Sequence, residues 1–191
     1  MKRNLLVAGA AVLVLTLSAA ATAQMTPEAR RRARELIDTL TEIQRAQSVR
    51  PSRSGRTMTI TESDLNAYIA YRIEADREKY TKELNLKLLA RNKVEGRMLI
   101  DLSSLRAGFL LPAKAELFFS AQAETKDGKV RITMDKLFLG TQSLSPAVLD
   151  TVIDIASRVE GVPPRTLKDW YDLPYGIRTM ESAPGRLTLK F

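Results

Sequence analysis

The strongest local signal in this chain of 191 residues is the run AELFFSAQAETKDGKVRITM, residues 115–134. Apolar side chains alternate with mostly polar ones on both sides of the dipeptide Asp127-Gly128. Such alternation is typical of strands that bury one face, and Asp-Gly suits the two-residue type I′ turn of a hairpin. The run therefore predicts an antiparallel hairpin whose inner face belongs to the core.

Similar alternation on both sides of this hairpin extends the sheet. It predicts strands over residues 84–88 and 98–102, and two short terminal strands within residues 177–191. Residues 163–171, which begin with two prolines, predict a short helical turn.

Two helices are expected to accompany these strands. The first begins at Thr61, with Asp64 near the capping-box position. The second is opened by Ser145-Pro146 as cap and first-turn proline, and Gly161 ends it. Helices laid on one face of an antiparallel sheet define an α+β fold.

The N-terminal 23 residues have the order of parts of a secretory signal peptide. These parts are the basic Lys2 and Arg3, an apolar run over residues 5–17, and the A-x-A motif Ala21-Thr22-Ala23. We expect cleavage before Gln24 and export to a bacterial periplasm. An uncleaved membrane anchor is the alternative, because residues 5–23 are about long enough to cross a bilayer.

Residues 24–56 are expected to form a basic amphipathic helix and a linker that precede a single domain over residues 57–191. Apolar residues recur at spacings of four and three, which predicts a helix over residues 27–47. Four arginines crowd its first two turns: Arg30, Arg31, Arg32 and Arg34. They form either a solvated face or a contact surface for anions.

Composition excludes several function classes. Histidine and cysteine are both absent, which rules out Ser-His-Asp and Cys-His catalysis and zinc sites with those ligands. Asp150 and Asp154 lie one helical turn apart, but Arg158 follows four residues later, which favours a structural ion pair over a cation site. We expect no enzymatic activity, no cofactor and no metal.

The net charge of +8 narrows the choice of partners. A basic protein often binds nucleic acid, but export argues against that partner. It favours anionic lipid, anionic envelope polymers or another envelope protein.

The segment TITESDLN, residues 59–66, resembles the opening motif of small bacterial envelope proteins of the YpmS and LmeA kinds. Further likenesses are GKVRI at 128–132, LFLG at 137–140, the helix led by Pro146, and Leu173-Pro174 before the terminal hairpin. Those proteins are related to the tubular lipid-binding (TULIP) superfamily, in which a curved antiparallel sheet wraps a long helix and leaves an apolar groove. Over residues 57–191 the resemblance implies a TULIP-like curved sheet packed against two or three helices, and a role in lipid binding. The arginine-rich helix is an addition to that pattern.

The groove implied by this resemblance would be lined by apolar residues from helices, strands and one loop. The candidates are Leu65, Ile69, Leu86, Leu110, Leu111, Leu117, Phe119, Ile132, Met134, Val152 and Ile153. The alternative is an ordinary packed core, because any sheet must bury an apolar face. Leu110 and Leu111 follow Phe109 in an expected loop, where they form either a plug under the sheet or a lip that touches membrane or ligand.

Two functions remain open. The leading hypothesis is a non-enzymatic periplasmic protein that binds lipid or another apolar ligand, in envelope maintenance or lipid transport. The alternative is an interaction or adaptor protein with a packed core, whose basic arm docks on a partner or an anionic envelope polymer. A cavity of several hundred Å³ would favour the first hypothesis, and a solid core the second.

Overall fold

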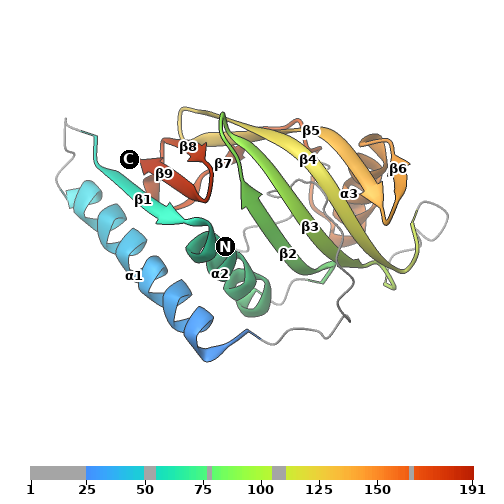
Figure 1. The fold of residues 1–191 in the computed structure, drawn as a ribbon, viewed down its shortest axis with the longest axis horizontal. Helices are drawn as coiled ribbons and strands as arrows, with labels where there is room; N and C mark the ends of the chain where they lie inside the picture. The colour runs from blue at the N-terminus through green and yellow to red at the C-terminus, as the bar shows by residue number, and fades with distance from the viewer. Residues whose placement is uncertain (1–24, 50–54, 77–78, 105–110, 164–165) are drawn as a thin grey trace.

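A computed structural model describes residues 25–49, 55–76, 79–104, 111–163 and 166–191. In these residues it shows an α+β architecture with a strongly curled antiparallel sheet, a smaller sheet and three α-helices (Figure 1). The predicted class, a curved antiparallel sheet packed with helices, is confirmed. The expected signal peptide, residues 1–23, and its cleavage site lie outside the described residues. Within the described part, no helix is both long and apolar enough to cross a membrane.

The hairpin at the centre of the large sheet is the predicted one. Strands β4 (Lys114–Lys126) and β5 (Lys129–Leu139) pair antiparallel, with Lys126 opposite Lys129. At the tip, Asp127 and Gly128 have φ values of 49° and 74°. A type I′ turn needs positive φ at both central positions, so the turn prediction is confirmed.

The large sheet extends from this hairpin in the order β2-β3-β4-β5-β6. Its other strands are β2 (Thr81–Leu88), β3 (Lys93–Asp101), β6 (Gln142–Leu144) and the short β7 (Tyr171–Asp172). Strand β7 pairs with the start of β5, and β6 pairs with its end. Gly96 in β3 explains part of the tight curl. A Cβ there would lie 2.7 Å from the Asn85 carbonyl oxygen and 2.9 Å from Leu86 Cδ2. A side chain would therefore force neighbouring strands apart.

A second, three-stranded sheet pairs the strand that follows α1 with the C-terminal hairpin. Its order is β1 (Thr57–Thr61), β9 (Arg186–Lys190) and β8 (Thr179–Ala183), all antiparallel. The hairpin of β8 and β9 matches the two predicted terminal strands. Strand β1 is not among the predicted strands, because its five residues directly precede a strong helix signal.

That helix, α2 (Glu62–Ala75), begins with a complete capping box. The Thr61 hydroxyl accepts a hydrogen bond from the Asp64 amide, and the Asp64 carboxylate accepts one from the Thr61 amide. Two other polar residues of the TITESDLN segment attach α2 to the edge of β2. Asn66 makes both hydrogen bonds to the Leu86 backbone at 2.7 Å, and Glu62 accepts one from the Leu88 amide. The segment thus caps a helix and closes a sheet edge.

The other helices match their predictions in part. Helix α3 (Ala147–Glu160) ends at Gly161 in the left-handed conformation, as predicted. The expected cap by the Ser145 side chain is wrong: Pro146 is the N-cap, and no side chain caps the helix. Backbone carbonyls close the first turn instead, because the amides of Val148 and Leu149 bond to Ser145 and Pro146.

Residues 163–171 do not form the predicted helical turn in their described part. Residues 166–169 make an isolated hydrogen-bonded turn, and the chain then enters strand β7. A short 3₁₀ helix, η1 (Pro174–Gly176), follows only after this strand.

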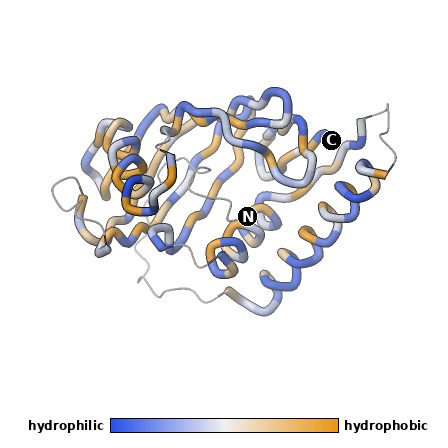
Figure 2. Tube along the Cα trace, turned by 180° about the vertical axis from the view of Figure 1, so that it is seen from behind, coloured by the Kyte–Doolittle hydropathy of each residue, from blue (hydrophilic) through white to orange (hydrophobic). Residues whose placement is uncertain are grey.

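Helix α1 (Pro27–Val49) is amphipathic as predicted, and hydrophobic positions recur along it between hydrophilic ones (Figure 2). Ala33, Leu36, Leu40 and Ile43 are its buried residues. Three of them, Leu36, Leu40 and Ile43, join a core cluster with Leu187, Leu189 and Phe191 at the C-terminus. Helix α1 therefore packs on the folded domain.

Candidate ligand-binding cavity

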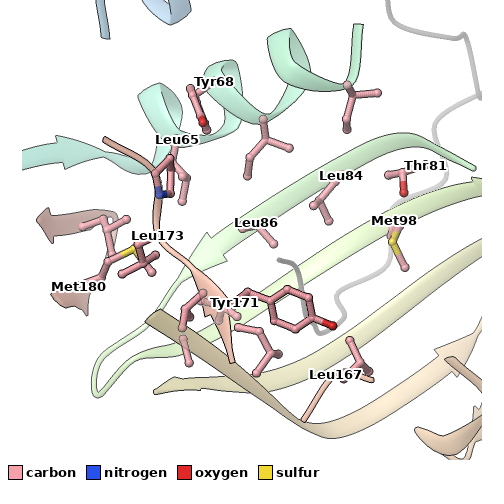
Figure 3. Close-up of a pocket in the computed structure, with 18 of the residues that line it drawn as sticks. Leu65, Tyr68, Thr81, Leu84, Leu86, Met98, Leu167, Tyr171, Leu173 and Met180 are labelled. Atoms are coloured by element: carbon pink, nitrogen blue, oxygen red, sulfur yellow. The ribbon is translucent and has the colours of Figure 1, made fainter. Parts of the chain in front are cut away.

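An apolar cavity of about 300 Å³ lies inside the curled sheet, covered by helices and by the segment after α3. Figure 3 shows Leu65 and Tyr68 of α2 on one side, and Leu84, Leu86 and Met98 of the sheet on the other. The lining also includes residues of α1 and of α3, and these two helices lie toward opposite ends of the molecule (Figure 1). The cavity is therefore elongated.

The structure places the candidate groove residues in two groups. Seven of them line the cavity: Leu65, Ile69, Leu86, Ile132, Met134, Val152 and Ile153. Leu111, Leu117 and Phe119 do not border the cavity and are packed in the core, where Leu117 and Phe119 are 0% exposed. For Leu111 this agrees with a plug under the sheet and not with an exposed lip. Leu110 lies outside the described residues.

Sequence reasoning missed much of the cavity wall, including residues of the small sheet: Ile60, Met180, Leu187 and Leu189. Two further missed parts are segments that cover the cavity. One is the segment after α3, which contributes Leu167, Tyr171 and Leu173 (Figure 3). The other is α1, which contributes Leu36 and Leu40. The apolar stripe of α1 was visible in the sequence, but nothing local indicated which surface it would cover.

Most polar groups near the wall already serve the fold. The Ser182 hydroxyl donates to the Leu89 carbonyl at 2.6 Å, and Asn92 Oδ1 accepts from the Ser182 amide at 2.7 Å. The Tyr171 hydroxyl donates to the Thr166 carbonyl at 2.6 Å. These bonds remove the cost of placing polar atoms beside an apolar space.

A tyrosine pair marks one boundary of the cavity. The rings of Tyr68 and Tyr175 meet edge to face, with centroids 6.5 Å apart. Burial raises the pKa of the Tyr68 hydroxyl well above its ordinary value, and the neighbouring Tyr175 adds to this rise while Arg72 opposes it. The Tyr68 hydroxyl therefore stays protonated over a wider pH range than that of an exposed tyrosine, and it interacts with the neighbouring Tyr175 hydroxyl.

The arginines at the start of α1 are mostly paired with carboxylates. Arg30 bonds to Glu74 of α2 at 2.8 Å, while Arg31 and Arg32 pair within α1 with Glu35 and Glu28. Arg34 has no ion-pair partner among the described residues. This pairing leaves little uncompensated positive charge on the first turns of α1.

The remaining sequence candidates have structural roles. Asp154 pairs with Arg158 at 2.7 Å, and Asp150 accepts a hydrogen bond from the Leu167 amide at 2.9 Å. Within the described ranges, no group of three or more acidic side chains is placed to hold a metal ion.

Comparison of this chain with family models, with curated proteins and with solved structures found no match. The functional argument therefore rests on the cavity and its surroundings.

Proposed function

We propose that this protein binds a lipid or another amphiphile with one apolar chain, without catalysing a reaction. The observation that supports this is the elongated apolar cavity of about 300 Å³. Its size lies at the lower end of the range for ligand sites, about 300–1,000 Å³, which suits a single chain. Each buried CH₂ group would contribute roughly 0.8 kcal/mol to binding.

We also propose that binding takes place in the periplasm, on the basis of Lys2 and Arg3, the apolar run that follows, and the Ala21-Thr22-Ala23 motif. N-terminal sequencing of the exported protein should find Gln24 as the first residue. Recovery of membrane-bound protein that still begins at Met1 would instead establish an anchor.

A matched pair of substitutions on β5 tests the cavity. Ile132 lines the cavity, whereas the next residue, Thr133, is exposed on the opposite face of the strand. Ile132→Trp should fill the space and abolish uptake of a fluorescent fatty-acyl probe. Thr133→Trp should leave uptake unchanged.

Native mass spectrometry of the protein purified from its own cell envelope should detect a co-purified single-chain lipid. Equal loss of uptake in both variants would place the probe on the outside of the sheet. If the unsubstituted protein takes up no acyl probe and carries no lipid, the cavity proposal is wrong, and the interaction-protein alternative replaces it.

A further inference from the structure

A second hollow, open to solvent and lined partly by charged side chains, lies beside Tyr175. It has a volume of about 360 Å³ and is formed by α1, α2 and Tyr175. Its lining residues are Arg34, Ile37, Asp38, Tyr71, Arg72, Ala75, Asp76 and Tyr175. Tyr175 also lines the apolar cavity. Tyr175 thus borders both the apolar cavity and a hollow that contains four charged side chains, and an amphiphile needs two such neighbouring surfaces.

The backbone of Tyr175 supports a special role for this side chain. Its φ is 58°, in the left-handed region that residues other than glycine, asparagine and aspartate rarely adopt. Tyr175 lies within η1, and the amide of Ile177 closes this turn on the Pro174 carbonyl at 3.2 Å. Strained residues of this kind cluster at ligand sites and switches.

The charges of the hollow are balanced but not all paired. Arg72 bonds to Asp76 with nitrogen-to-oxygen distances of 2.9 and 2.7 Å. Neither Arg34 nor Asp38 has an ion-pair partner within the part of the chain that the structure describes, although they stand one helical turn apart on α1. One cationic and one anionic group are therefore open to a ligand. A head group with a single charge would meet a like charge as well as an unlike one.

We propose that this hollow binds the zwitterionic head group of a single-chain amphiphile, with its anionic group at Arg34 and its cationic group at Asp38. The chain passes Tyr175 and enters the cavity, so this inference rests on the proposed function. The tyrosine pair lies where head and chain would meet, because Tyr175 borders both spaces and its neighbour Tyr68 borders the cavity.

Four probes with the same chain length and different heads test this inference by calorimetry below their micellar concentrations. They are dodecylphosphocholine, monolauroylglycerol, dodecanoate and dodecyltrimethylammonium. The unsubstituted protein should bind dodecylphosphocholine about two- to fivefold more tightly than the other three, the size expected for contacts between exposed charges.

Substitutions in the hollow should change this order in opposite directions. Arg34→Ala should weaken the binding of dodecylphosphocholine and strengthen that of dodecyltrimethylammonium, each about two- to fivefold. Asp38→Ala should weaken the binding of dodecylphosphocholine and strengthen that of dodecanoate by a similar factor. Monolauroylglycerol should be unaffected by either change. Arg31→Ala is the matched control, because Arg31 is exposed on the same helix but lies outside the hollow.

The outcomes separate this inference from the function it rests on. If the unsubstituted protein and both variants bind all four probes with equal affinity, the head group lies elsewhere. In that case only the head-group inference fails. Tightest binding of monolauroylglycerol would likewise overturn it in favour of an uncharged head. If none of the four probes binds, the proposed function itself fails.

Discussion

The cluster beneath the large sheet and the cluster beneath the small sheet are both apolar, but they come from different parts of the chain. The buried residues of the first all fall between Ile69 and Tyr171. The second combines Leu36, Leu40 and Ile43 of α1 with residues as distant as Phe191. The central cluster is thus built within one continuous stretch, while the terminal cluster requires both ends of the described chain to meet.

The cavity lies where these two clusters adjoin, and it is lined by members of both. Close packing normally leaves few voids larger than a water molecule in a protein core. Here the void lies at the boundary between the two clusters, where side chains from both face the same space. The comparison therefore locates the space between two differently built clusters, and each prediction below tests one of them.

The largest effect is expected in the central cluster. Phe119 is 0% exposed and does not border the cavity, so Phe119→Ala should lower the free energy of unfolding by about 3–5 kcal/mol. Phe118 is only half-buried on the opposite face of β4, and Phe118→Ala should cost clearly less. Urea denaturation measures both. Equal costs would mean that the inner face of β4 is not the packed part of the core.

A somewhat smaller effect is expected in the terminal cluster. Leu40 is 3% exposed and borders the cavity, so Leu40→Ala should cost about 2–4 kcal/mol. Gln44, one turn further along α1, is exposed, and Gln44→Ala should change stability by less than about 0.5 kcal/mol. If Leu40→Ala also had no effect on the urea midpoint, α1 would be a detached arm in solution.

The same division explains what could be predicted from sequence. The central hairpin could be predicted, because its alternation and its Asp127-Gly128 turn are local signals. Strand β1 could not, because its partner β9 is remote: Thr59 and Thr188, which face each other across the two strands, are 129 residues apart. The length of β1 is only five residues, too short for its alternation to outweigh the helix signal that follows.

For the candidate site, the sequence could predict only which strand side chains share a face of the sheet. Leu117, Phe119, Ile132 and Met134 share the inner face of the sheet because strand side chains alternate. Which of them pack against other side chains, and which border an empty space, depends on how the sheet curls and what covers it. The covering segment with Tyr171 and Leu173 carries no pattern that local reasoning could assign to a cavity.

An intermediate effect is expected at the turn between β4 and β5, a hairpin that contributes to the central cluster. Gly128 has a φ of 74°, so Gly128→Val should destabilise the protein by about 1–3 kcal/mol. Gly128→Asn is the control, because asparagine tolerates the left-handed region better, and it should cost less. Identical melting temperatures for both variants and the unsubstituted protein would contradict the turn geometry.

The smallest effect is expected for the ion pair that links α1 to the domain, Arg30 with Glu74. Their side chains are 42% and 54% exposed, so water screens the interaction and only about 0.2–1 kcal/mol of coupling is expected. A double-mutant cycle with Arg30→Ala and Glu74→Ala measures this coupling, which should shrink further in about 1 M salt, where the Debye length is roughly 3 Å. A coupling as large as the cost of Leu40→Ala would mean that charge, and not the apolar stripe, holds α1 in place. If the coupling is small and Leu40→Ala is costly, burial of apolar surface is what holds α1 on the domain. The same apolar residues of α1 would then stabilise the terminal cluster and form part of the cavity wall.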